Sequence, residues 1–135
     1  GRLLGGHGGL AEYDENSGIS LKKTDFENKI LFFEDIPEVC SVEYMGKFFD
    51  WLGNKGYLHV LNGVIIGKMR SGNSFEPFAE AIRKIVSVKY GLADLPIMYG
   101  LNFGHTSPIC ILPYNAEAEL DIDNLQFTIL ESGVI

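Results

Sequence analysis

Lys29-Ile30-Leu31-Phe32-Phe33-Glu34-Asp35 is the stretch of this sequence that decides the fold. Four apolar residues follow one another in it, a pattern typical of a strand that is buried on both faces of a parallel sheet. The run stops at two carboxylates, and Pro37 disfavours a helix through the turn that follows. The stretch therefore predicts an inner strand with acidic side chains at its carboxyl end.

Helices and strands alternate after this stretch. Apolar residues recur at three- and four-residue steps between residues 39 and 55, which predicts an amphipathic helix. Residues 61–68 predict a second buried strand, and residues 71–74 a turn that leads into a second helix ending near residue 91. Residues 95–99 predict a third strand. This order is typical of right-handed crossovers onto a parallel sheet.

The last third of the chain has a different pattern. Residues 109–112, 116–120 and 125–130 are three strand candidates joined by short links, and residues 121–124 are hairpin-like. Their imperfect alternation suits antiparallel strands with one wetter face. We therefore predict an α/β fold, a small parallel sheet with crossover helices that is extended by an antiparallel β unit.

Length and charge narrow the possible functions. The chain has 135 residues, enough for one compact domain, and its hydrophobic content of 46% allows a substantial core. Eighteen acidic residues against eleven basic ones give a net charge of -7, which argues against nucleic acid and anionic lipid as partners. No apolar run approaches the roughly 20 residues of a membrane-spanning helix. We expect a globular domain that binds neither nucleic acid nor membrane.

Cysteine and histidine usage predicts no metal site. Cys40 and Cys110 lie far apart without a Cys-x-x-Cys spacing, and we expect both to be buried free thiols in a reducing compartment. Three scattered histidines, His7, His59 and His105, show no recognisable ligand spacing. The sequence therefore implies neither a metal nor another cofactor.

Polar side chains follow two of the predicted strands. Glu34 and Asp35 come directly after the first, and His105 lies in the loop that follows the third. Ligands of open parallel sheets bind outside the carboxyl ends of the strands, where a carboxylate and an imidazole from neighbouring strand ends could form the orienter–base half of a nucleophilic triad. The alternative interpretations are a first-turn helix charge at Asp35 and a half-exposed turn histidine at His105. Ser107 has no established nucleophile geometry.

Five short motifs occur in a fixed order along the chain. They are Gly1-Arg2-Leu3-Leu4-Gly5-Gly6, Lys29-Ile30-Leu31-Phe32-Phe33-Glu34-Asp35, Gly63-Val64-Ile65-Ile66-Gly67, Phe103-Gly104-His105-Thr106-Ser107-Pro108 and Leu112-Pro113. In this order and spacing the sequence resembles the C-terminal domain of the LD-carboxypeptidase family of serine peptidases. That family includes muramoyltetrapeptide carboxypeptidases and microcin-C immunity proteins, and the resemblance runs from residue 1 to about residue 130.

The resemblance implies a catalytic role for two residues. His105 would be the general base and Glu34 its orienter, while the nucleophilic serine would belong to an N-terminal domain that is absent from this chain. The family reaction is the metal-free hydrolysis of the amide bond to terminal D-alanine in cytoplasmic muropeptides. The family also implies a swivelling β/β/α fold and a possible homodimer. Because the sequence starts at Gly1 without a methionine, we expect residues 1–135 to be one domain of a longer protein, inactive when isolated.

Two positions depart from the family pattern. His7 stands where the family usually has asparagine, and Asn115 stands where it usually has glycine. The loop around His105 is somewhat closer to the microcin-immunity branch, so a different amide or a phosphoramidate is an alternative substrate. A non-catalytic swivelling binding module is a second alternative, and it predicts that Glu34 and His105 lie too far apart to hydrogen-bond. A nucleotide-binding domain is disfavoured because the glycines at residues 5–9 and 63–67 lack the required spacing.

Overall fold

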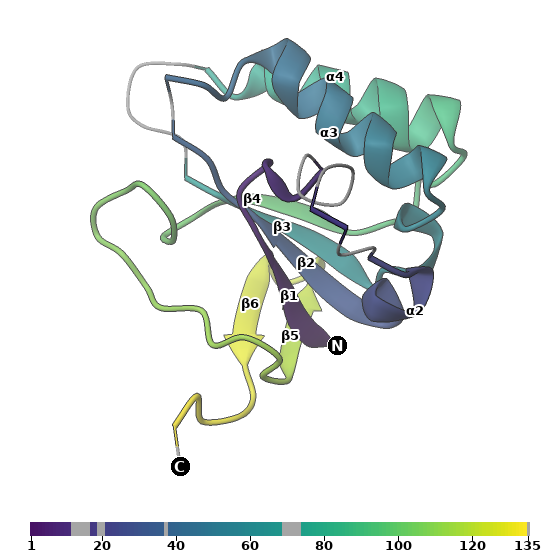
Figure 1. The fold of residues 1–135 in the computed structure, drawn as a ribbon. Coiled ribbons are helices and arrows are strands. Elements are labelled where there is room, and N and C mark those ends of the chain that lie inside the picture. Colours follow the sequence, from purple (N-terminus) through teal and green to yellow (C-terminus); the bar gives the residue numbers. More distant parts are fainter. Residues whose placement is uncertain (12–16, 19–20, 37, 69–73, 135) are drawn as a thin grey trace.

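Four parallel strands lie side by side, in the order β1-β2-β3-β4, in the computed structural model (Figure 1). They are β1 (Arg2–Gly6), β2 (Lys29–Phe33), β3 (Gly63–Gly67) and β4 (Ile97–Leu101). The structure describes residues 1–11, 17–18, 21–36, 38–68 and 74–134. The register pairs Gly6 with Phe33 and Phe33 with Ile66, so these strands end at nearly the same level. The carboxyl ends of the strands therefore form one edge of the sheet.

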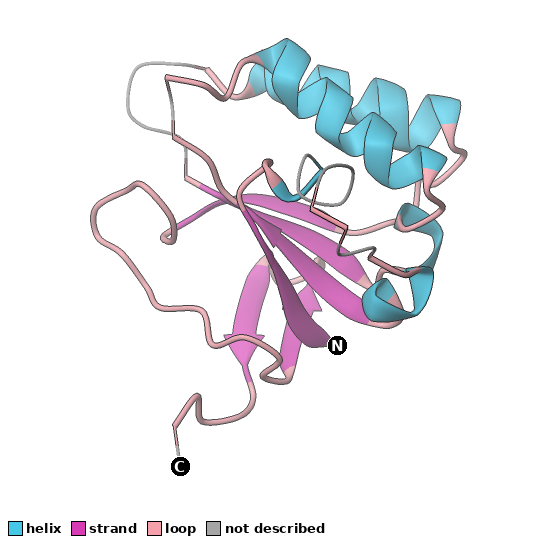
Figure 2. Ribbon diagram, in the orientation of Figure 1, coloured by secondary structure: helices cyan, strands magenta, loops and turns pink. Residues whose placement is uncertain are grey.

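Helices cover one face of this sheet (Figure 2). They are α3 (Val42–Asn54) and α4 (Glu76–Arg83), the second continued by the π-helical segment η2 (Lys84–Lys89). The short helix α2 (Lys23–Phe26) lies in the connection between β1 and β2. The 3-10 turn η1 (Leu58–Val60) lies in the connection between α3 and β3. Helix α3 begins later than the sequence predicts, because the Ser41 hydroxyl caps it by accepting a hydrogen bond from the Tyr44 amide.

The core has two layers, one on each face of the sheet. Leu31, Phe33, Val64 and Ile66 point toward the helices, where α3 contributes a row of buried apolar side chains, Met45, Phe48, Phe49 and Leu52. The intervening residues, Ile30, Phe32 and Ile65, pack on the opposite face with Leu3, Phe103 and Ala118. Strand β2 is thus buried on both faces, which confirms the prediction from its apolar run.

A two-stranded antiparallel sheet lies on the face that the helices leave open (Figure 1). It consists of β5 (Ala118–Asp121) and β6 (Gln126–Ile129), and the Asp121 carboxylate orders the turn between them by accepting the amides of Asp123 and Asn124. The α/β fold with an added antiparallel unit is therefore confirmed.

The strand that we predicted at residues 109–112 does not form. Ile109 and Ile111 are exposed, and these residues belong to an irregular loop that the Cys110 amide closes by donating to the Asn102 carbonyl. An apolar run forms a strand only where a partner strand takes up its backbone groups, and none is available here within the described residues. Of the predicted turn at residues 71–74, only Ser74 lies within the described residues, and Pro37 lies outside them.

Residues 115–118 cover the outer edge of β1. The Leu3 amide donates to the Ala116 carbonyl, the Asn115 amide donates to the Leu3 carbonyl, and the Ala118 amide donates to the Gly1 carbonyl. The Arg2 guanidinium forms a forked ion pair with Glu131 beside them. Residues 115–118, at the start of β5 and just before it, therefore supply the backbone partners that an edge strand otherwise lacks.

The two cysteines differ in environment, so the prediction of two buried thiols is only half right. Cys40 is buried, and burial, with a smaller contribution from the Asp35 carboxylate, raises the pKa of its thiol to about 12. Cys110 is exposed because it belongs to the loop that does not become a strand. None of the described helices is long and apolar enough to traverse a membrane.

Two glycines test the packing of these layers. In Gly5→Ala the added methyl group would overlap the Phe32 backbone, so we expect a loss of about 1–3 kcal/mol in the free energy of unfolding. In Gly46→Ala the methyl group would meet only the end of Ile85 at 3.5 Å, so the better helix propensity should stabilise α3 by about 0.5–1 kcal/mol. Urea denaturation of both variants checks this, and equal effects would contradict the register of β1 and β2.

Candidate active site

Glu34 lies at the carboxyl edge of the sheet, one residue beyond β2. Its amide donates to the Gly6 carbonyl at 3.0 Å, which extends the β1–β2 pairing to this position. Its side chain is 21% exposed. The Glu34 carboxylate therefore lies at the carboxyl edge of the sheet, and the hydrogen bond to β1 fixes the backbone of this residue.

His105 reaches the same edge from the loop that follows β4. Its Nδ1 atom lies 2.7 Å from the Glu34 Oε2 atom, and its side chain is 55% exposed. The loop is held by short-range backbone bonds, with the Thr106 amide donating to the Gly104 carbonyl. The structure thus brings together the two residues that the sequence nominated.

The sequence analysis places Glu34 and His105 at the ends of neighbouring strands, and this part of the prediction is wrong. Strand β3 lies between β2 and β4, so the loop after β4 must cross the end of β3 to reach Glu34. Gly67 is the last residue of β3, and a Cβ atom there would lie 2.7 Å from the Phe103 carbonyl oxygen and 3.2 Å from Glu34 Cβ. The crossing therefore depends on a residue without a side chain at this position.

Gly104, in the loop after β4, packs directly against the Glu34 side chain. Its φ of +81° lies in the left-handed region that favours glycine, and a Cβ atom would come within 2.6 Å of Glu34 Oε2. Sequence reasoning assigned no positioning role to Gly67 or Gly104. Two signals were present in the sequence: Gly67 ends a predicted strand, and Gly104 directly precedes the candidate base His105.

The short contact fixes the chemistry of the imidazole. A carboxylate accepts hydrogen bonds, so Nδ1 carries the proton when His105 is neutral and Nε2 keeps its lone pair. Among the described residues, no other group hydrogen-bonds to the ring. A half-exposed imidazole with its tautomer set by a carboxylate has the arrangement of the orienter and base in a nucleophilic triad. Ser107, two residues further along, makes no hydrogen bond to this ring.

Asp35 serves the neighbouring loop rather than a helix. Its Oδ2 atom accepts from the Gly8 amide at 3.2 Å and its Oδ1 atom from the Ile36 amide at 2.8 Å, whereas Ser41 caps α3. His7 lies in this loop and is exposed, with its Nδ1 atom 3.1 Å from the Gly9 amide nitrogen. In the described part of the chain, no group of three or more His, Cys, Asp or Glu residues is placed to hold a metal ion.

Known proteins resemble this chain over most of its length. The sequence model of the LD-carboxypeptidase C-terminal domain matches residues 1–120. A putative carboxypeptidase from Treponema pallidum is 29% identical over 116 residues, which are 85% of this chain and 32% of that protein. The chain therefore spans about a third of the length of this curated relative.

Solved structures show the same similarity. An MccF-like protein from Streptococcus pneumoniae, solved in complex with AMP, superposes with a TM-score of 0.79 at 27% identity, covering 96% of this chain and 40% of that one. A muramoyltetrapeptide carboxypeptidase from Oxalobacter formigenes superposes with a TM-score of 0.63 at 22% identity, covering 98% of this chain and 42% of that one, a likeness of fold alone. The chain belongs to the LD-carboxypeptidase family, and the part of the family that it matches is the C-terminal domain.

Proposed function

We propose that residues 1–135 are the C-terminal catalytic domain of a serine-type LD-carboxypeptidase. The observation that carries the proposal is the contact of 2.7 Å between His105 Nδ1 and Glu34 Oε2 at the carboxyl edge of the sheet. A second, N-terminal domain supplies the nucleophilic serine, since the relatives are two to three times longer than this chain. The isolated chain is then inactive because it holds two of the three triad members.

Each residue has one role in the proposed reaction. His105 Nε2 takes the proton of the serine hydroxyl as that oxygen attacks the scissile carbonyl, and later returns a proton to the leaving amine. The Glu34 carboxylate holds the neutral ring in the productive tautomer and stabilises the imidazolium that forms. The serine and the groups that stabilise the oxyanion belong to the N-terminal domain.

The substrate in this proposal is a cytoplasmic muropeptide, and the bond cleaved is the amide that joins terminal D-alanine to the L-centre of a diamino acid. The match to the LD-carboxypeptidase C-terminal domain and to curated carboxypeptidases supports this choice. The proposed location in the cytoplasm follows from this substrate.

An aminoacyl nucleotide is the second candidate substrate. The observation that favours it is the similarity to the MccF-like protein, which was solved in complex with AMP. A non-catalytic binding module is less consistent with the structure, because that hypothesis expected Glu34 and His105 to be out of hydrogen-bonding reach.

Substrate choice and the roles of the pair are tested together in the longer protein that carries this chain. We expect it to release D-alanine from a muramoyl tetrapeptide, whereas cleavage of an aminoacyl sulfamoyl adenosine alone would favour the second candidate. His105→Ala should lower kcat about 10⁶-fold and Glu34→Gln about 10⁴-fold, because the base does more than its orienter. Chromatographic assay of both products gives these rates.

Matched controls come from the same chain. His59→Ala removes an exposed histidine on η1 and Glu119→Gln neutralises an exposed carboxylate on β5, and both variants should retain wild-type kcat. Hydrolysis by His105→Ala at the rate of the His59→Ala control, with the fold verified by circular dichroism, would contradict the proposal.

Gly67→Ala tests the crossing of β3 by the catalytic loop. The added methyl group should displace Phe103 and Glu34 by a few tenths of an ångström or more, and we expect kcat to fall about 10²-fold. Gly63→Ala, at the other end of the same strand, places a methyl group against the flexible Leu120 side chain and the Pro96 carbonyl. It should cost stability without a matching loss of kcat, and equal kcat values for the two variants would show that the crossing is not needed.

A further inference from the structure

The carboxyl edge of the sheet has open space over Gly6, the last residue of β1. Apart from its chain neighbours, a Cβ atom on Gly6 would meet one described group within 4 Å, the Tyr114 hydroxyl at 3.6 Å. A Cβ atom on Gly67 or Gly104 would instead overlap groups of the active-site loop or Glu34. The Gly6 carbonyl accepts from the Glu34 amide, so the space over Gly6 lies directly beside the proposed catalytic pair.

Tyr114 forms one wall of this space. Its ring packs edge-on against Phe32 with the centroids 5.1 Å apart, and the residue is 63% exposed. Phe103 packs edge-on against the same Phe32 ring, with a centroid distance of 6.3 Å. The loop that carries His105 is therefore anchored on Phe32 at both ends, and it places Tyr114 and His105 at the same edge of the sheet.

The Tyr114 hydroxyl has a donor that the described residues do not use. Burial raises the pKa of this phenol, and a hydrogen bond from the Gly5 amide to the phenol oxygen opposes the rise. The hydroxyl therefore keeps its proton at neutral pH. A phenol accepts through its oxygen and donates its one proton, and Tyr114 donates to no group of the described residues. The proton is available to a bound molecule.

We propose that Tyr114 is a substrate-binding residue, and that its hydroxyl donates a hydrogen bond to a carbonyl oxygen of a peptide that lies over Gly6. The peptide is the one that the proposed function supplies, so this inference rests on that function. The leaving group of the proposed reaction is a single D-alanine. The acyl part of the substrate is therefore the longer part, and the part that can extend past Glu34 to β1.

Charge favours an uncharged oxygen as the acceptor. Glu34 and Asp35 follow β2 on the neighbouring strand end, and the chain has a net charge of -7. A substrate carboxylate over Gly6 would be repelled by these two side chains, whereas a peptide carbonyl would not be. The φ of Gly6 is +149°, a conformation that residues with side chains rarely adopt, so the floor of this space stays open to a peptide backbone.

Calorimetric titration of a muramoyl tetrapeptide into the longer protein that carries this chain tests the proposal without hydrolysis. In a His105→Ala background, Tyr114→Phe should raise the Kd about ten-fold, because one hydrogen bond to an uncharged group is lost. The dipeptide of the diamino acid and D-alanine has no carbonyl group before the scissile one. Tyr114→Phe should therefore leave the Kd of this dipeptide unchanged.

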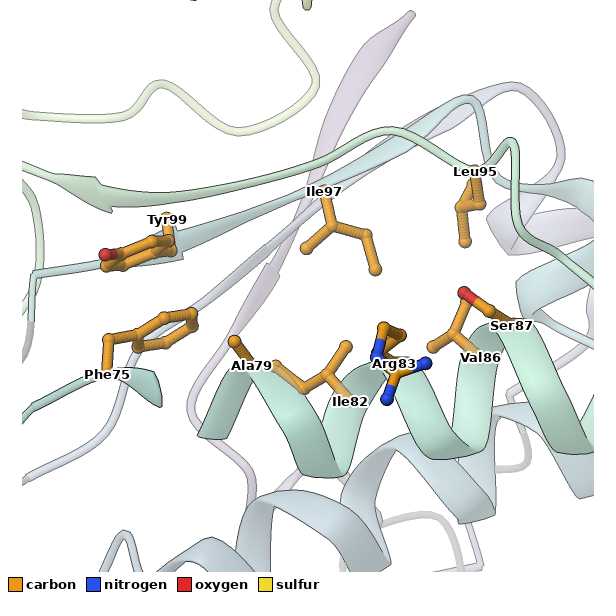
Figure 3. Close-up of a pocket in the computed structure, with 9 residues that line it drawn as sticks. All are labelled: Phe75, Ala79, Ile82, Arg83, Val86, Ser87, Leu95, Ile97 and Tyr99. Atoms are coloured by element: carbon orange, nitrogen blue, oxygen red, sulfur yellow. The ribbon is translucent and has the colours of Figure 1, made fainter. Parts of the chain in front are cut away.

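The kinetics of the active longer protein give a second readout. Tyr114→Phe should raise KM for the tetrapeptide about ten-fold and change kcat by less than about two-fold, a split that a loss of packing around His105 would not produce. Tyr99→Phe is the matched control, since Tyr99 is also exposed. Figure 3 shows Tyr99 beside Phe75 at the apolar pocket between β4 and α4, where the two rings stack. Tyr99→Phe should keep the wild-type Kd and KM.

The results that overturn this role of Tyr114 differ from those that overturn the proposed function. A tetrapeptide that does not bind, that binds equally well to Tyr114→Phe, or that loses no more affinity than the dipeptide would exclude the hydrogen bond. A wild-type protein that binds the tetrapeptide through Tyr114 but releases no D-alanine would contradict the proposed function and leave the substrate-binding role in place. Circular dichroism establishes the fold of each variant.

Discussion

The burial of β2 on both faces is the constraint on which the rest of the structure depends. Leu31 and Phe33 pack against α3 on one face of the parallel sheet. Ile30 and Phe32 pack on the opposite face, which the two-stranded sheet of β5 and β6 covers. A slip of the strand by one residue would exchange these two sets of side chains. The register is therefore fixed, and with it the position of Glu34 at the first point where the chain leaves the sheet.

The site forms because the loop after β4 crosses the carboxyl end of β3 at a residue without a side chain. His105 comes from beyond β4, and its path to Glu34 passes over β3 where Gly67 has no side chain to obstruct it. Gly104 then turns against the carboxylate in a left-handed conformation. The apolar core thus fixes one member of the pair through a rigid strand, and two glycines allow the other member to approach within 2.7 Å.

The sequence could predict what depends on local pattern, and less of what depends on distant partners. The apolar run before Glu34 indicated a doubly buried strand, and the spacing of Met45, Phe48 and Leu52 indicated α3. The strand predicted at residues 109–112 was wrong, because apolar character alone does not supply a partner strand. The pairing of Glu34 with His105 was expected, because ligands bind at the carboxyl ends of parallel strands and because the family resemblance assigns these residues. The position of β3 between their strands was not expected, since strand order is a property of the whole sheet.

The edges of the sheet differ in the same physical terms. Residues 115–118 satisfy the backbone of β1, and nothing in the described residues does so for β4. The proposed catalytic pair lies elsewhere, at the carboxyl ends of the strands, where Glu34 sets the tautomer of His105. Nitrogen-15 NMR of the neutral His105 ring in this chain measures that tautomer directly. Our account predicts a proton on Nδ1 and a bare Nε2, with the preference lost in Glu34→Ala, and a proton on Nε2 in the unaltered chain would contradict it.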